Sequence, residues 1–185
     1  MCSSDLPDLG RSGRQMRWIV AAKVILLACV VIFFAHLARP VGPEFRVSRF
    51  SETGEKSPVV GMGASGKFVI AWESFDQDKH DDCFFAKRYN AFGRSWSGAF
   101  QVIKQENCDQ KEPSVGMDAS GNFVIAWEIN YCCQGVDGIY AQRYDSSGKT
   151  LGGEFRVNTD TTGQKVRPSV GMNASGDFVV VWETG

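Results

Sequence analysis

The sequence repeats itself at a fixed interval, and this feature constrains the fold more than any other. Three related segments open with a proline and read PVVGMGASGKFVIAWE from Pro58, PSVGMDASGNFVIAWE from Pro113 and PSVGMNASGDFVVVWE from Pro168. Successive prolines are 55 residues apart, and so many identities at one offset exclude coincidence. A repeated unit of this kind cannot bury its own apolar faces and must stack on its neighbours. The fold is therefore expected to be modular.

Each period contains four strand-like runs separated by short polar turns. In the second period these runs span 113–117, 123–128, 139–144 and 154–158. The second run is apolar on both of its alternating faces, which indicates a strand covered on both sides. The last run is apolar on one face only, as expected of an outer strand. A glycine closes the turns at Gly121 and Gly148, where a tight hairpin requires a positive φ.

These runs predict an all-β fold, a partial β-propeller built of four-stranded antiparallel blades. The 20 glycines and the 12% of aromatic residues suit many short strands joined by tight turns. The predicted segments are a lone fourth strand at 44–48, a blade at 58–103, a blade at 113–158 and a half blade at 168–185. The recurring aromatic residues are assigned to the core, namely Phe68, Trp72, Phe123, Trp127, Phe178 and Trp182.

The number of repeats is small for this architecture. A propeller typically closes with about four to eight blades. We therefore expect the chain to be part of a longer protein, and we expect the isolated fragment, with apolar blade faces left open, to be unstable or prone to self-association.

The first forty residues predict a targeting segment. After a cytoplasmic stretch at 1–16, whose opening letters CSSDL resemble a translated sequencing adapter, Trp18 to Ala38 is apolar apart from Lys23. As a helix this stretch would rise about 31 Å, enough to cross a bilayer. Basic residues on its N-terminal side predict export of everything that follows. A signal-anchor or signal-peptide helix over 17–39 leaves the repeats attached to the inner membrane and facing the periplasm or exterior, or secreted if the helix is cleaved.

The repeat motifs resemble those of bacterial exported and surface proteins. The order of PSVGMDASGNFVIAWE, GIYAQRYDSSG and GGEFRVN is similar to the propeller repeats of the periplasmic Tol-Pal system. A looser resemblance exists to the Asp-box of sialidase-type propellers, but Gly121 and Trp127 stand further apart than that motif allows, and Gly63 replaces its aspartate-like residue. The resemblance implies a propeller architecture outside the cytoplasm and carries over no catalytic residue.

The residues that differ between repeats fall on one predicted face. In a four-stranded blade the connections from second to third strand and from fourth to first strand lie at the same end. The first of these connections holds the chain's dense carboxylate group, Asp76, Asp78, Asp81 and Asp82, which could supply oxygen ligands to Ca²⁺. The alternative is a solvated acidic loop. No other cofactor is expected.

Four cysteines also map to this face: Cys83, Cys108, Cys132 and Cys133. In an oxidising compartment they predict a disulfide, with Cys108 bonding to Cys83 or to the adjacent pair. A zinc site is disfavoured because no C-x₂-C spacing occurs. Arg88 and Arg143 recur in the frame, which favours a blade-to-blade hydrogen bond or ion pair over ligand binding.

Composition excludes several functional classes. The net charge of −1 and the lack of a basic stripe argue against nucleic acid as a partner. The only histidines, His36 and His80, argue against a histidine-rich metal site or a Ser-His-Asp triad. The leading hypothesis is a non-catalytic envelope or secreted domain that binds protein or glycan through the divergent face. The alternatives are a fragment of a propeller glycosidase or lyase, with Asp81 and Asp82 as candidate acids, and a structural adhesin array.

Overall fold

The computed structural model describes residues 44–48, 54–76, 81–102, 109–130 and 137–185. The chain divides into two units, 1–51 and 52–185, and the fold described below is that of the second unit. In the first unit, Val47 and Ser48 of the predicted lone strand are buried. The predicted targeting helix at 17–39 lies outside the described residues and stays a prediction. Within the described ranges there is no helix, and so none with the length and apolar character needed to cross a bilayer.

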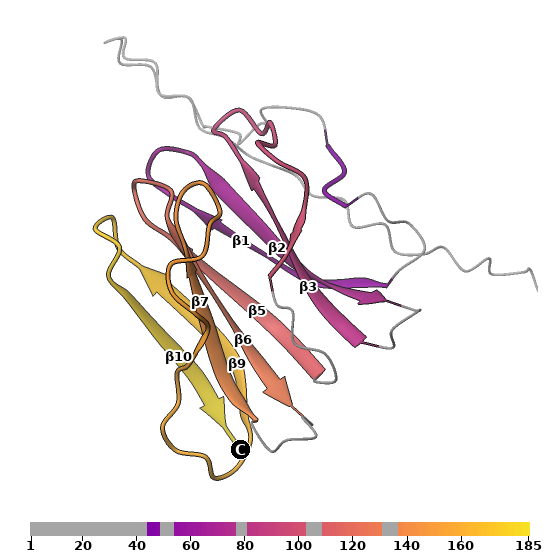
Figure 1. The fold of residues 1–185 in the computed structure, drawn as a ribbon, viewed down its shortest axis with the longest axis vertical. Helices are drawn as coiled ribbons and strands as arrows, with labels where there is room; N and C mark the ends of the chain where they lie inside the picture. The colour runs from indigo at the N-terminus through magenta and orange to yellow at the C-terminus, as the bar shows by residue number, and fades with distance from the viewer. Residues whose placement is uncertain (1–43, 49–53, 77–80, 103–108, 131–136) are drawn as a thin grey trace, which may run out of the picture. The chain divides into compact units, whose positions relative to one another are not determined.

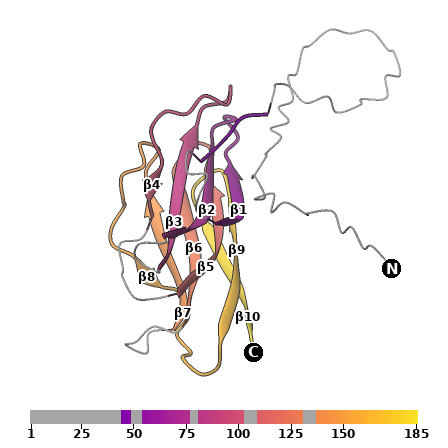
Figure 2. The ribbon, with the colours of Figure 1, turned by 90° about the vertical axis from the view of Figure 1, so that its right-hand side faces the viewer.

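The second unit consists of antiparallel sheets stacked face to face (Figures 1 and 2). The first sheet has the order β1 (Glu55–Met62), β2 (Phe68–Asp76), β3 (Asp81–Tyr89) and β4 (Phe100–Gln101). The second repeats this order with β5 (Asp109–Met117), β6 (Phe123–Asn130), β7 (Gly138–Tyr144) and β8 (Phe155–Arg156). A third sheet pairs β9 (Lys165–Met172) with β10 (Phe178–Thr184). Two four-stranded blades and one pair of strands therefore follow the 55-residue period, as predicted.

Each blade begins with the same local distortion. The ladder between the first two strands shifts register between Lys56 and Val59 in β1 and between Lys111 and Ser114 in β5, which marks a β-bulge. The β9–β10 ladder shifts at the equivalent point. The residue before each proline adopts a left-handed backbone, with φ values of 46°, 53° and 53° at Ser57, Glu112 and Arg167. The bulge lets proline enter a strand without removing a ladder hydrogen bond.

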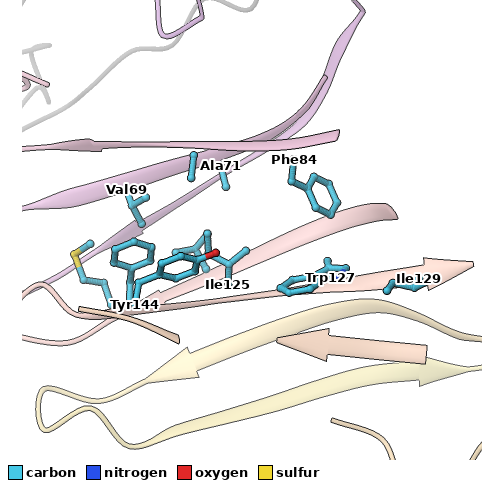
Figure 3. Packing of buried hydrophobic residues seen from close by; sticks show 11 residues of the cluster. Val69, Ala71, Phe84, Ile125, Trp127, Ile129 and Tyr144 are labelled. Carbon is cyan, nitrogen blue, oxygen red and sulfur yellow. The ribbon is translucent and has the colours of Figure 1, made fainter. Parts of the chain in front are cut away.

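The main core lies between the first and second blades. Val69, Ala71 and Phe84 of the first blade pack against Ile125 and Trp127 of the second, as Figure 3 shows. All five are fully or almost fully buried. Tyr144 joins the same cluster, stacks on Phe123 with ring centroids 4.8 Å apart, and donates a hydrogen bond across the joint to the carbonyl of Val102. The alternating residues of the second strand therefore form the core that the repeat predicts.

A smaller core lies between the second blade and the β9–β10 pair. Val124, Ala126 and Ala141 are buried there against Val170 and Met172. Every residue of β6 is buried, because a sheet covers each of its faces. Phe178 and Trp182 of β10 are only half-buried, whereas their counterparts Phe68, Trp72, Phe123 and Trp127 are buried.

Glycine in the first strand of each blade permits this stacking. A Cβ atom placed on Gly61 would lie 2.6 Å from Val115 Cγ1, and one on Gly116 would lie 2.8 Å from both Val170 Cγ1 and Met172 Cβ. Real Cβ atoms do not approach neighbours so closely, so the sheets could not pack at this separation with a side chain there. The recurring glycine is thus required by the neighbouring blade.

Several strand boundaries differ from those predicted. The connection expected to hold Asp76, Asp78, Asp81 and Asp82 is shorter than predicted, because β2 continues to Asp76 and β3 starts at Asp81, with an unbroken register between them. β5 likewise starts at Asp109, before the bulge, while β8 covers only Phe155 and Arg156 of its predicted run. These differences arise because backbone pairing between adjacent strands does not require apolar side chains.

The glycine joint leads to a prediction with an internal control. Gly116→Ala should lower the free energy of unfolding by about 1–3 kcal/mol, because the added methyl overpacks the joint. Gly171→Ala occupies the same place in the next repeat, where a Cβ would meet only Val179 Cγ2 at 3.5 Å. Urea denaturation of dilute protein should show a loss for the first variant and little change for the second. Equal stabilities would contradict this account.

Candidate binding face

Buried polar side chains gather at one end of the blades, here called the polar end. They lie where the second and third strands, or the fourth and next first strands, are connected. The buried residues at this end are Glu73, Ser74, Gln110, Glu128, Asn130, Asn158 and Lys165. In the described part of the second unit, the other buried polar residues are Asp118 and Gln142, nearer the opposite end. Burying polar groups is costly unless each finds a partner, so the partners explain the arrangement.

Glu73 and Glu128, each of which directly follows a tryptophan in the second strand of its blade, join neighbouring blades. Glu73 Oε1 accepts a hydrogen bond from the backbone N–H of Glu112 over 2.9 Å, and Glu128 Oε2 accepts one from the N–H of Arg167, also over 2.9 Å. Both donors are the left-handed residues of the bulges. We call this repeated contact the glutamate tie. A hydrogen bond to a charged group typically contributes about 1.5–3 kcal/mol. That range is enough to offset the roughly 1–2 kcal/mol cost of a left-handed backbone.

The charge of Glu128 is poorly solvated at this joint. Burial raises the pKa of the Glu128 carboxyl above its ordinary value, and nearby Glu112 and Glu73 raise it further. The hydrogen bond from Arg167 and the charge of Lys111 lower this pKa, but burial is the largest effect. Asn130 Nδ2 also donates to Glu128 Oε1 over 3.0 Å. With both carboxylate oxygens engaged, Glu128 holds the blades together and is not presented to a ligand.

A second polar network orders the connection between β8 and β9. Asn158 Oδ1 accepts from the N–H of Ile139 over 2.8 Å, and Asn158 Nδ2 donates to the carbonyl of Asp160 over 2.6 Å. Lys165 Nζ lies 3.3 Å from Asp160 Oδ2 and donates to the carbonyl of Thr162. Hydrogen bonds from Thr162 lower the pKa of the Asp160 carboxyl to about 2. This connection is therefore held by its own side chains and presents a defined surface.

Exposed charges surround these buried groups. Glu112, Asp137 and Arg167 are exposed at the polar end, and Arg167 forms an exposed ion pair with Glu183 over 3.1 Å. Arg156 Nη2 donates to the carbonyl of Asp137 over 2.6 Å. The exposed ion pair between Arg167 and Glu183 contributes little to stability.

The opposite end consists of uniform turns. In each, the N–H of the first residue donates to the carbonyl four residues on, as in Asp118 to Asn122, Asp145 to Lys149 and Asn173 to Asp177. Glycine closes each turn with a positive φ, as at Gly121 and Gly148. At Gly63 a Cβ would clash with the carbonyl of Asp118 in the next blade. This explains why Gly63 stands where the Asp-box has an aspartate-like residue.

One predicted blade-to-blade contact is confirmed at these turns. Arg88 Nη1 donates to the carbonyl of Ser146 in the second blade over 2.7 Å. Burial lowers the pKa of Arg88, and the nearby charge of Asp145 raises it. Its counterpart Arg143 is exposed.

The predicted calcium and disulfide sites fall largely outside the described residues. Asp76, Asp81, Asp82 and Cys83 are placed in the paired ends of β2 and β3, with Asp76 opposite Asp81 and Phe75 opposite Asp82. Asp78, Cys108, Cys132 and Cys133 are not among the described residues. Elsewhere in the described ranges, no group of three or more His, Cys, Asp or Glu side chains could hold a metal ion. Both the calcium site and the disulfide stay predictions.

Sequence reasoning missed the glutamate tie. A signal for it exists, because the glutamate after tryptophan recurs as Glu73, Glu128 and Glu183. A carboxylate repeated at the end of a buried strand indicates a structural partner in the next repeat. The network around Asn158 and Lys165 carries no such repeated signal.

Comparison with known proteins supports the fold and no family. No protein-family model matches the chain, and no curated protein does. The endo-arabinase from Bacteroides thetaiotaomicron VPI-5482 is similar in structure with a TM-score of 0.50 and 12% identity, over 78% of this chain and 58% of that one. The GH43 endo-arabinanase from Bacillus licheniformis gives 0.44 and 12%, over 64% and 42%. A Dyadobacter fermentans DSM 18053 protein of unknown function gives 0.40 and 10%, over 75% and 64%.

The first of these similarities concerns the fold alone, since so little sequence is shared. The likeness to the Bacteroides structure supports the predicted all-β, propeller-like fold. This chain spans about three fifths of the length of the Bacteroides enzyme. The expected resemblance to exported and Tol-type repeats stays a prediction.

Glu128 gives a test of the tie that depends on pH. Because its folded-state pKa is raised, the folded protein binds the proton more tightly than the unfolded chain, and Glu128 lowers stability as pH rises above about 4.5. Glu128→Gln removes this titration. The melting temperature of the natural protein minus that of the variant should therefore decrease between pH 4 and pH 7. A difference that grows with pH would show that the tie favours the charged form overall.

Proposed function

We propose that this propeller-like domain is a non-catalytic module that binds a glycan through its polar end. The observation that carries the proposal is the concentration of polar groups and of non-repeated sequence at this end, against uniform turns at the other. A surface that serves only as a scaffold has no need of this asymmetry. In the proposal the apolar segment before the repeats directs the domain out of the cytoplasm, where envelope glycans occur.

A glycan suits the chemistry of this face. Sugar hydroxyls both donate and accept hydrogen bonds, and Glu112 and Arg167 present an exposed carboxylate and an exposed guanidinium group beside an ordered connection. The near-neutral chain does not favour a strongly charged partner. A protein ligand would be expected to need a larger apolar patch at the same end.

Catalysis is disfavoured by the roles of the buried carboxylates. A glycosidase places two carboxyl groups on either side of the bond that it cleaves. Glu73 and Glu128 are instead buried and committed to the backbone of the following blade. The alternative, a glycosidase fragment, is favoured by one observation, the likeness to proteins named endo-arabinases.

Affinity electrophoresis in gels that contain soluble polysaccharides, arabinan among them, tests the proposal. We expect at least one polysaccharide to retard the full chain. Glu112→Gln combined with Arg167→Gln should weaken this binding by about tenfold or more, because hydrogen bonds to charged groups are lost. Neither change removes the backbone N–H used by the glutamate tie.

The matched control changes two exposed residues at the opposite end, Arg94→Gln and Lys149→Gln. It should bind like the natural protein. Retardation by no polysaccharide, or equal weakening in both double variants, would overturn the proposal. Release of new reducing ends from arabinan would favour the glycosidase alternative.

A further inference from the structure

Large apolar side chains stand in solvent at the end of the blades opposite the polar end, here called the turn end. They belong to the outer turns, at 90–96 in the first blade and 145–151 in the second, which follow the third strands β3 and β7. Phe92 is 88% exposed, Trp96 46% and Leu151 42%. Because burying such side chains removes apolar surface from water, they can contribute to binding an apolar partner.

The exposure of these positions does not depend on which blades stand beside them. Leu151 belongs to the second blade, which packs against a sheet on each of its faces, and it is still exposed. Ser147, which stands 55 residues after Phe92, is exposed in the same blade. Trp96 occupies the place of Leu151 in the first blade. A sheet packed against the first blade should therefore leave Phe92 and Trp96 accessible.

The fold of the outer turn does not require an aromatic residue at its tip. Both outer turns close with the same backbone hydrogen bond, from the N–H of the first residue, Asn90 or Asp145, to the carbonyl four residues on. The side-chain Oδ1 of that first residue accepts two backbone N–H groups of its own turn in each case. The second turn forms in this way with Ser147 where the first has Phe92. Phe92 is therefore available for a role in binding.

Basic side chains accompany the apolar ones. Arg94 and Lys149 occupy equivalent places in the two outer turns, and both are exposed. Lys67, which ends the turn between β1 and β2, places its Nζ atom 5.1 Å from the centre of the Trp96 ring. Arg143, near the end of β7, is exposed as well. Although the whole chain has a net charge of only −1, its cations thus gather beside the exposed apolar residues of the turn end.

The carboxylates within the turns of the two blades are engaged by those turns. Asp118 is buried and accepts hydrogen bonds from the backbone N–H and the side-chain amide of Asn122. Asp145 accepts hydrogen bonds from the side-chain hydroxyl of Ser147 and from two backbone N–H groups. The exposed Asp177 lies in the separate turn between β9 and β10, and Glu154 lies beyond the second outer turn. The two outer turns therefore present mainly positive charge to a partner.

We propose that the turn end binds the surface of an anionic lipid bilayer. Aromatic residues favour the headgroup level of a membrane, where Phe92, Trp96 and Leu151 leave water. Lys67, Arg94 and Lys149 then lie among anionic headgroups, which attract each cation near the surface. A bilayer offers apolar chains and anionic groups at adjoining depths, which an acidic polysaccharide does not.

This inference does not depend on glycan binding. The turn end and the polar end are opposite ends of the same blades, so a domain held to a bilayer by its outer turns keeps the polar end directed away from the lipid. The two surfaces can therefore be tested separately, each with variants of the other as controls.

Quenching of Trp96 fluorescence by brominated lipid tests the proposal in the full chain. Bromine atoms on the acyl chains quench tryptophans that contact the bilayer. Each chain is compared with its own Trp96→Leu version, which carries the residue of the second blade, so quenching of the other tryptophans cancels. In vesicles of brominated phosphatidylcholine and phosphatidylglycerol, the natural chain should lose more emission than its Trp96→Leu version. The difference should be largely lost in vesicles without phosphatidylglycerol and at high salt.

Two variants separate the charged from the apolar contribution. Arg94→Gln combined with Lys149→Gln should lose about four fifths or more of the Trp96 quenching at the phosphatidylglycerol fraction that half-saturates the natural chain. Phe92→Ser, which also introduces the residue of the second blade, should lose most of it through the apolar term. These changes leave the backbone hydrogen bonds of the turns in place, and circular dichroism should show all variants folded.

The matched control is Glu112→Gln combined with Arg167→Gln at the polar end, which should keep the full Trp96 quenching. Equal loss of emission in the natural chain and its Trp96→Leu version would overturn the proposal, because Trp96 would then not contact lipid. Equal Trp96 quenching with and without phosphatidylglycerol would also overturn it, since the headgroup charge would play no part. The variant of Arg94 and Lys149 is expected to bind polysaccharide normally, so failure here and failure of glycan binding are distinguishable.

Discussion

Close approach of one sheet to the next is the constraint on which this structure depends. Each blade exposes apolar residues on both faces of its second strand, and these can leave water only if another sheet covers them. Gly61 and Gly116 let valine and methionine of the following blade enter the space above the first strand. The apolar joint supplies most of the driving force for stacking, since it removes large side chains such as Trp127 and Phe84 from water. The polar contacts then set the register between blades.

The glutamate tie and the strand bulge depend on each other. A left-handed residue before proline is unfavourable in isolation, and a buried carboxylate is unfavourable without a partner. The hydrogen bonds from Glu112 to Glu73 and from Arg167 to Glu128 offset both costs, because each gives a partner to a buried carboxylate and stabilises a left-handed residue. This pairing concentrates buried charge at the polar end of the blades.

Much of the fold could be predicted because the same pattern of strands and turns recurs in each repeat. The order of four strands, the tight turns and the burial of Phe123 and Trp127 follow from periodicity and glycine placement. The half-burial of Phe178 and Trp182 could not, because burial of a strand depends on whether a sheet lies on each side of it, and the repeat unit alone does not state this. The extension of β2 to Asp76 was missed because backbone pairing leaves no mark in side-chain polarity. The buried polar network at the polar end joins residues of different repeats, which no local pattern shows.

The glutamate tie binds a main-chain N–H, and it therefore makes no demand on the identity of the residue that donates. The two observed donors are Glu112 and Arg167, and Ser57, at the equivalent position of the first blade, has nearly the same φ. A repeat array built in this way has one site per module where geometry is constant and chemistry is unrestricted. Gene duplication could copy the module intact, and later substitutions at that single position would diversify the surface without disturbing the folding of any unit.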